Sequence, residues 1–248
     1  MSLRKRDVIA LFQWAIGRSS YYIRRREWPW RFLWVRSFAM ALFLQPRKGF
    51  RLLKPLYTGR LSPSGYDLQV HGARVLRIVL DEANKSGIRF FLVWGTLLGC
   101  VRERAFIWND TDIDLGMLSD EFHRIDTLVE GMKRRGFRTR IVDEYKLSLV
   151  SRWHPTLFID IDLVYEKDGK LAITNATSDE RNYYTYLFPT DAFSGFKPAR
   201  FTDGIDVLIP WVPEIFLEAV YGDWKTPQKK ADFLRGPLNL VIEPKTVL

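Results

Sequence analysis

Three aspartates lie close together in the stretch WNDTDIDLGM, at positions 110, 112 and 114. Polar and apolar residues alternate through this stretch, which predicts a β-strand whose alternate side chains point to one face. Asp110, Asp112 and Asp114 would then share a face, where each carboxylate raises the pKa of its neighbours. A divalent cation removes that repulsion, and clustered oxygen ligands favour Mg²⁺ or Mn²⁺. The spacing therefore predicts a metal site on this strand.

A second acidic strand is predicted in TLFIDIDLVY. Asp160 and Asp162 fall on one of its faces, and the apolar Ile159 and Ile161 fall on the other. A carboxylate pair inside an apolar strand is costly unless water, a cationic side chain or a metal accompanies it. Two such strands side by side would form one site, in which either Asp160 or Asp162 completes the ligand set. Either of them could also accept a proton during a reaction.

The segment before the first acidic strand suits a phosphate group. IRFFLVW predicts a short buried strand, and Gly95 and Thr96 follow it at the start of an expected helix. Backbone N–H groups at a helix start can bind phosphate oxygens, and the Thr96 hydroxyl could add a hydrogen bond. Arg102 and Arg104 come next, and both could neutralise phosphate charge, although Arg104 also suits an exposed loop.

Other chemistries find little support in the sequence. His71, His123 and His154 lie far apart, and Cys100 sits in an apolar run with no base nearby, which argues against a nucleophilic triad. The ligand spacing of an EF-hand is absent. The single cysteine excludes an internal disulfide and any multi-cysteine zinc site.

A small sheet covered by helices is needed to position these residues. Apolar residues recur at helical spacing over 66–86, and the segments 119–135 and 212–221 also suit helices. Asp168 and Gly169 predict a hairpin turn. Strands are expected over 88–94 and in FIWNDTDIDLGM, FRTRIVD, KLSLVS and TLFIDIDLVY. The order of these elements predicts an α+β fold, with a small mixed sheet flanked by helices.

Charge divides the chain into two parts. Residues 1–60 hold 14 Lys and Arg against two acidic residues, a local net charge of +12, and they include 12 aromatic residues. Residues 61–248 hold 24 Lys and Arg against 27 acidic residues and are therefore close to neutral. We expect a basic, aromatic, helical segment over 1–60 and the catalytic domain over 61–248.

Two roles for residues 1–60 stay open. Their mixture of Trp, Phe, Leu and Arg is typical of helices that lie in a membrane interface on anionic head groups. The same residues could instead pack against the domain. No uninterrupted apolar run is long enough to span a bilayer, and no secretory signal is evident. No nucleic-acid-binding motif accompanies the charge, so nucleic acid is not expected as a partner.

The stretch FFLVWGTLLGCVRERAFIWNDTDIDLGM resembles the LicD/fukutin family, which carries a strand, GTLLG, a basic residue and then an acidic D-x-D-x-D segment. FIDIDLVY and EAVYGDWKTP resemble two later motifs of that family in the same order. The sequence departs from the family pattern at Asn109, where a Trp is customary, and at Asp162, where an aromatic residue is usual.

The resemblance implies a nucleotidyltransferase-type fold and a metal-dependent phosphotransferase. The expected reaction moves phosphocholine or ribitol phosphate from a CDP-linked donor to a glycan or lipid-linked glycan and releases CMP. By position, Gly95, Thr96 and Arg102 match the phosphate-binding residues. The metal ligands implied are Asp110, Asp112, Asp114 and Asp160, while Asp112, Asp114, Asp160 and Asp162 are the catalytic candidates.

Two rival functions accompany this expectation. A true nucleotidyltransferase would place a nucleoside monophosphate on a small molecule or protein, and an inactive family member would act as a membrane-associated scaffold. The intact carboxylates argue against the scaffold, because buried acids without a metal would cost stability.

A role in cell-envelope glycan modification would place the chain in the cytoplasm, with or without peripheral attachment to the cytoplasmic membrane.

Overall fold

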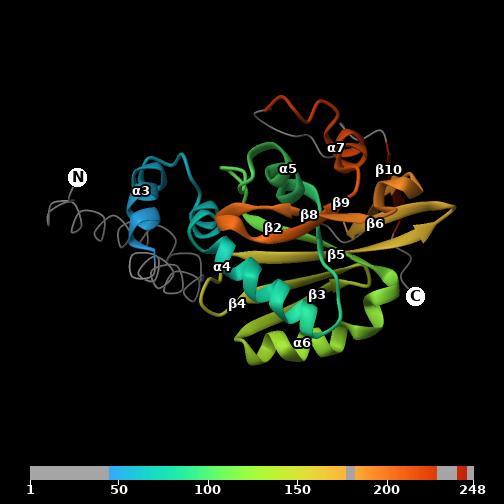
Figure 1. The fold of residues 1–248 in the computed structure, drawn as a ribbon, viewed down its shortest axis with the longest axis horizontal. Coiled ribbons are helices and arrows are strands. Elements are labelled where there is room, and N and C mark those ends of the chain that lie inside the picture. Colours follow the sequence, from blue (N-terminus) through green and yellow to red (C-terminus); the bar gives the residue numbers. More distant parts are fainter. Residues whose placement is uncertain (1–44, 177–181, 228–238, 245–248) are drawn as a thin grey trace, which may run out of the picture.

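The computed structural model describes residues 45–176, 182–227 and 239–244. Helices pack around a central mixed sheet (Figure 1), so the α+β class predicted from the sequence is confirmed. The helices are α3 (Pro46–Tyr57), α4 (Pro63–Lys85), α5 (Trp94–Glu103), α6 (Ile125–Arg134) and α7 (Pro213–Tyr221), with short 3-10 helices η1 (Ser119–Arg124), η2 (Thr190–Phe193) and η3 (Thr202–Gly204).

The sheet is mixed because its two acidic strands are parallel while their other neighbours are antiparallel. The strand order is β1-β2-β5-β6-β7-β10, and β4 also pairs with β5 and carries β3 at its outer edge. β2 runs parallel to β5, whereas β4 and β6 run antiparallel to β5. The strands are β1 (Phe91–Leu92), β2 (Asp112–Leu118), β3 (Phe137–Asp143), β4 (Lys146–Ser151), β5 (Phe158–Lys167), β6 (Lys170–Ala176), β7 (Asn182–Phe188), β8 (Phe196–Arg200), β9 (Asp206–Pro210) and β10 (Leu240–Pro244).

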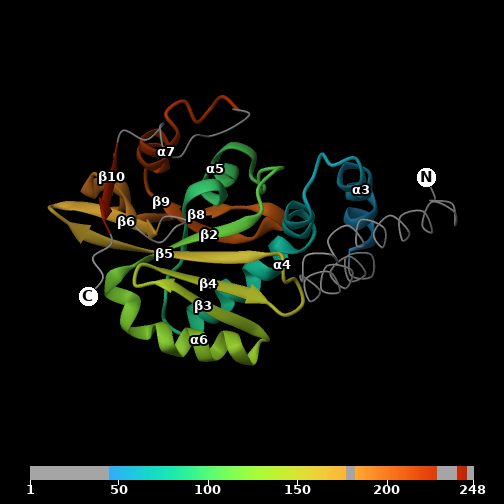
Figure 2. The same cartoon turned by 180° about the vertical axis from the view of Figure 1, so that it is seen from behind.

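The parallel pair β2–β5 sets the two faces of the sheet. Asp114 lies opposite Asp160 in the strand register, and the apolar Ile113 lies opposite Ile159. Because side chains alternate along a strand, the acids share one face and the isoleucines share the other. Helix α4 covers the isoleucine face, since it passes in front of the sheet in Figure 1 and behind it in Figure 2. The acids therefore lie on the face away from α4.

Helix α4 begins where the sequence supplies a cap. The Ser62 side chain accepts a hydrogen bond from the Gly65 N–H at 2.9 Å, and Pro63 occupies the first turn, where its missing N–H costs nothing. The helix ends just before Gly87, whose φ of +69° suits glycine. The helix predicted over 66–86 is confirmed, with a start three residues earlier, at Pro63.

Two strand predictions near the site need correction. Of the strand predicted over 88–94, only Phe91–Leu92 forms a strand, which is β1. Helix α5 already begins at Trp94. Asp110 does not lie on the same strand as Asp112 and Asp114. Its N–H closes a turn on the carbonyl of Ile107 at 3.1 Å, and β2 starts only at Asp112.

The predicted hairpin turn and C-terminal helix are present. Asp168 and Gly169 both have positive φ, of 52° and 70°, as a tight β5–β6 turn requires. Helix α7 covers most of the predicted 212–221. Residues 196–210 form the separate hairpin β8–β9, which the sequence analysis did not predict.

The described end of the basic segment packs against helix α4. Leu52, Leu53 and Leu56 of α3 are buried against Tyr66 and Val70 of α4. An ion pair between Lys48 and Asp203, at 2.7 Å, also ties this helix to the region of η3. The remainder of the segment, residues 1–44, lies outside the described residues. In the described part of the chain, no helix is both long and apolar enough to cross a membrane.

Candidate active site

Three carboxylates converge at the start of β2. Asp112 and Asp114 come from the strand, Asp110 comes from the turn before it, and one oxygen of each lies within 4.8 Å of the others. Asp110 Oδ1 accepts a hydrogen bond from the Thr111 N–H at 3.0 Å. Asp110 Oδ2 is buried and has no hydrogen-bond partner among the described residues. Because buried polar atoms are nearly always paired, this oxygen is suited to a cation, and the three acids form a ligand set that Mg²⁺ or Mn²⁺ would fit.

Burial is the main reason why the pKa values of these three acids are raised. It raises the pKa of Asp110 to about 7, with a further contribution from Asp112. Burial also raises the pKa of Asp112, and Asp160 adds to the effect. The pKa of Asp114 lies well above its usual range, first through burial and then through Asp112 and Asp110. A bound cation would supply positive charge next to these three acids and so favour their ionised forms.

Gly95 makes room for the aspartate cluster. A Cβ atom at this position would lie 2.6 Å from Asp110 Oδ2, closer than real contacts allow. The glycine at the start of α5 therefore lets the carboxylate approach the helix, where backbone N–H groups favour negative charge.

The two acids of β5 have different surroundings. Asp160 accepts a hydrogen bond from Ser148 Oγ at 2.6 Å and forms an ion pair with Lys146 Nζ at 2.8 Å. Asp162 is fully buried; Trp94 Nε1 donates to its Oδ2 at 2.5 Å, and Lys146 Nζ lies 3.5 Å from its Oδ1. Burial raises the pKa of Asp162 to about 6, although Lys146 and Trp94 oppose the shift.

Lys146 is the cation between these acids. Burial alone would lower its pKa, but Asp162 and Asp160 outweigh that effect and raise it, so the side chain stays charged. Trp94, which donates to Asp162, has a φ of +45°, a conformation that bulky residues rarely adopt and that the surrounding structure must impose.

The three predicted phosphate-binding residues, Gly95, Thr96 and Arg102, lie in different surroundings. Thr96 is fully buried, and its hydroxyl accepts the N–H of Asp114 at 2.9 Å, which fixes α5 against β2. Arg102 lies in the last turn of α5 and pairs with Glu103 at 2.6 Å. Only Gly95 of the three lines a pocket beside the aspartates. The phosphate roles of Thr96 and Arg102 stay predictions.

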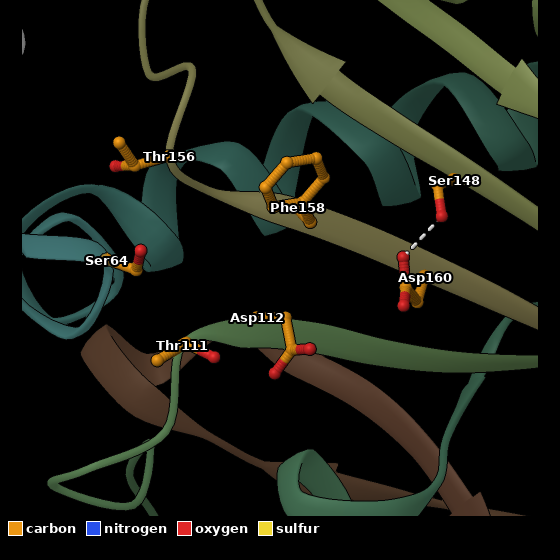
Figure 3. A pocket seen from close by; sticks show the side chains of 7 residues that line it. All are labelled: Ser64, Thr111, Asp112, Ser148, Thr156, Phe158 and Asp160. Carbon is orange, nitrogen blue, oxygen red and sulfur yellow. Dashed lines mark hydrogen bonds between the residues drawn. The ribbon is translucent and has the colours of Figure 1, made fainter. Parts of the chain in front are cut away.

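Two pockets meet at Asp112. The first, here called the lysine pocket, has a volume of about 450 Å³ and contains Lys146 and the aromatic side chains of Trp94, Tyr186 and Tyr221. The second, here called the hydroxyl pocket, has a volume of about 380 Å³ (Figure 3). Its lining residues are Ser64, Thr111, Asp112, Ser148, Thr156, Phe158 and Asp160. Since Asp112 lines both, a group bound in one pocket lies next to a group bound in the other.

Several of these residues were missed by the sequence analysis. Lys146 and Ser148 point to the acid face because they lie opposite Asp162 and Asp160 in the β4–β5 register. Their only sequence signal is a Lys and a Ser two residues apart in the short strand KLSLVS. Tyr221 belongs to the recognised YGDW motif, and the structure places it beside the aspartates at the end of α7.

The fold is that of a nucleotidyltransferase-type domain, and the chain belongs to the LicD/FKTN/FKRP family. The nucleotidyltransferase-domain profile of that family matches residues 87–210. This range contains Gly95, Thr96, Arg102 and the site aspartates of both strands. Helices α3 and α4, and the YGDW motif, lie outside it.

Curated relatives include the ribitol-5-phosphate transferase FKTN of Macaca fascicularis and of Homo sapiens. Each is 26% identical over 171 residues, which cover 67% of this chain and 36% of the relative. The chain thus spans about a third of the length of these relatives. A crystal structure of ANT(2'')-Ia in complex with adenylyl-2''-tobramycin matches at 15% identity and a TM-score of 0.37, over 62% of this chain and 77% of that one. That likeness is loose.

Proposed function

We propose that the chain is a metal-dependent phosphotransferase that moves a phospho-alcohol group from a CDP-linked donor to a glycan hydroxyl and releases CMP. Family membership and the name of the FKTN relatives support the reaction class and favour ribitol phosphate over phosphocholine. The observation that carries the proposal is the unpaired, buried Asp110 oxygen within a three-carboxylate cluster at the junction of two pockets.

Asp110, Asp112 and Asp114 would hold the cation. A Mg²⁺ or Mn²⁺ ion bound there would neutralise charge on the phosphate oxygens of the donor. Lys146 supports the same task from β4, because it lines the lysine pocket and is held in its charged form by Asp160 and Asp162. We therefore place the donor phosphates in the lysine pocket, near Gly95 and the start of α5.

The acceptor hydroxyl would attack from the side of Asp160. Its oxygen forms a bond to the transferred phosphorus, and the bond from that phosphorus to the bridging oxygen of CMP breaks, with its electron pair leaving on CMP. The hydroxyl proton passes to a carboxylate. Asp160 suits this role better than Asp162, because Asp160 lines the hydroxyl pocket while Asp162 is fully buried. Ser148 and Lys146 hold the Asp160 carboxylate, and each oxygen retains a lone pair for the proton.

A membrane-facing role for the basic segment fits a lipid-linked or envelope acceptor. The outer face of α3 exposes Arg47, Phe50, Arg51 and Lys54, whereas its leucines face α4. Exposed basic residues around an aromatic ring favour anionic lipid head groups. We propose peripheral attachment to the cytoplasmic membrane through this face together with residues 1–44.

The decisive experiment incubates the full chain with CDP-ribitol, CDP-choline and other CDP-linked donors, Mg²⁺ and a panel of glycans. The products are scored by CMP release and by the mass gained by the acceptor. A gain of ribitol phosphate or phosphocholine supports the proposal, and a gain of CMP itself indicates a true nucleotidyltransferase. If no donor is consumed while Mg²⁺ still raises the melting temperature, the chain is an inactive metal-binding relative.

A further inference from the structure

The hydroxyl pocket combines side-chain hydroxyl groups with one exposed aromatic ring. Ser64 comes from the first turn of α4, Thr111 precedes β2, Ser148 lies in β4 and Thr156 precedes β5. They surround the ring of Phe158, as Figure 3 shows. Phe158 is 37% exposed, although it lies on the same face of β5 as Asp160. An apolar ring bordered by hydroxyl groups and carboxylates is suited to a ligand that has both an apolar face and many hydroxyl groups.

Charge distinguishes this pocket from the lysine pocket. The residues that line the hydroxyl pocket include two acids and no Lys, Arg or His, whereas the lysine pocket contains Lys146. A diphosphate placed in the hydroxyl pocket would meet carboxylates without a cationic side chain among these lining residues. A neutral polyhydroxyl ligand has no such penalty, and it can exchange hydrogen bonds with Ser64, Thr111 and Thr156.

The pocket is held in shape by contacts outside it. Thr156 Oγ1 donates to the carboxylate of Asp67, a fully buried residue of α4, so the loop before β5 is fixed to the helix. A Cβ at Gly65 would lie 3.2 Å from the carbonyl oxygen of Asp110, which shows how closely the first turn of α4 approaches the aspartate cluster. A preformed pocket loses less conformational entropy when a ligand binds.

We propose that the hydroxyl pocket binds the acceptor, and that the acceptor group is a neutral sugar ring or polyol whose C–H face packs on Phe158. Its attacking hydroxyl points to Asp112 and Asp160, next to the donor phosphates in the lysine pocket. This inference rests on the proposed phosphotransferase function and adds the acceptor site and its chemical class.

Steady-state kinetics of Phe158→Ala tests the inference, with the donor and the acceptor of the wild-type reaction varied separately. We expect the KM for the acceptor to rise roughly tenfold or more, as for the loss of one aromatic contact, and the KM for the donor to stay within about twofold. Phe158→Tyr retains the ring and should restore the acceptor KM. Phe122→Ala removes another exposed ring, 46% exposed, from η1 outside both pockets and should change neither constant.

Three results would overturn the inference. An unchanged acceptor KM in Phe158→Ala would show that the ring does not contact the acceptor. A rise in the donor KM alone would show that Phe158 stacks on the nucleobase of the donor instead. A lowered melting temperature in Phe158→Ala, with Ser64→Leu leaving the acceptor KM unchanged, would assign the ring a structural role. Failure of the wild-type chain to transfer anything contradicts the proposed function itself, so the two failures are distinguishable.

Discussion

A Cβ atom at Gly95 would lie 2.6 Å from Asp110 Oδ2, so the missing side chain at position 95 is what allows that carboxylate to join Asp112 and Asp114. The contact links the start of α5 to the turn before β2. It makes Gly95 a determinant of the proposed metal site as well as a candidate for phosphate binding.

Gly95→Ala should weaken cation binding without unfolding the chain. Alanine is a better helix former than glycine, and the atom that its Cβ would meet is the end of the Asp110 side chain rather than backbone. We expect the metal-free melting temperature to stay near the wild-type value, and the Kd for Mn²⁺ to rise by about tenfold or more. Isothermal titration calorimetry measures the Kd. Gly195→Ala is the control, because a Cβ at Gly195 meets nothing within 4 Å. Equal Mn²⁺ affinity in both variants would contradict this role for Gly95.

Stabilisation by Mg²⁺ should increase with pH. Burial raises the pKa of Asp110 to about 7 and that of Asp162 to about 6, both above the unfolded value near 3.8. The folded chain therefore retains protons that the unfolded chain has released, and these groups make the metal-free protein less stable as pH rises from about 4 to 7. A cation binds only the deprotonated acids, so the stabilisation that it gives the folded chain grows over the same pH range.

Thermal unfolding in EDTA and in Mg²⁺ at pH 5, 6, 7 and 8 measures this effect. At a hundredfold excess over Kd, binding contributes about 2.7 kcal/mol, or about 5–10 °C for a domain of this size. We expect the Mg²⁺-induced rise in melting temperature to be small at pH 5 and largest at pH 8. Asp112→Asn should abolish the rise at every pH, and a rise that is independent of pH would refute the assignment.

Replacing Lys146 should destabilise the sheet. Lys146→Met leaves Asp160 and the fully buried Asp162 without their shared cation. Loss of one partner from a buried ion pair costs about 3–5 kcal/mol. Denaturant unfolding measures the change, and Lys85→Met serves as control because its pair with Asp81 is exposed and contributes less than about 1 kcal/mol. A similar small loss in both variants would show that Lys146 is not needed to hold the buried acids.

The two acids of β5 should respond differently to amidation. Asp160→Asn removes the proposed base and should lower kcat by about 10²–10⁴ with little change in melting temperature. Asp162→Asn weakens the contact with Lys146 behind the site and should lower the free energy of unfolding by about 1–3 kcal/mol. The reverse pattern, with turnover lost in Asp162→Asn and retained in Asp160→Asn, would exchange the two roles.

Lipid attachment through α3 should depend on charge. We expect the full chain to sediment with vesicles that contain phosphatidylglycerol and to stay in solution with phosphatidylcholine alone. Changing Arg47, Arg51 and Lys54 together to Glu should lower the partition coefficient by roughly a hundredfold or more, since each basic residue near the surface contributes about 1 kcal/mol. Unchanged sedimentation of this variant would indicate that the exposed face of α3 does not contact lipid.

The sequence was most informative where local patterns determine the structure. The apolar spacing of α4, the alternation in β2 and β5 and the Asp168-Gly169 turn each depend on neighbouring residues, and each is present in the structure. Asp112 and Asp114 could be placed on one face of β2, and Asp160 and Asp162 on one face of β5, because side-chain direction within a strand follows from alternation alone.

The parts that sequence could not predict depend on long-range pairing. Lys146 reaches the acids only because β4 lies beside β5, and nothing in KLSLVS specifies that neighbour. Asp110 joins the cluster from a turn rather than from the strand, through a contact that Gly95 permits. The hydroxyl pocket is assembled from α4, β2, β4 and β5, so no single motif indicates it.

The most direct test of the central claim is the acceptor mass measured for the wild-type chain and for Asp112→Asn, with CDP-ribitol or CDP-choline, Mg²⁺ and a glycan panel. We predict that the wild-type chain releases one CMP for each phospho-alcohol group gained by the acceptor, and that Asp112→Asn, like the wild-type chain in EDTA, releases none. Equal transfer by Asp112→Asn, or transfer that persists in EDTA, would contradict a metal-dependent phosphotransferase built on these aspartates.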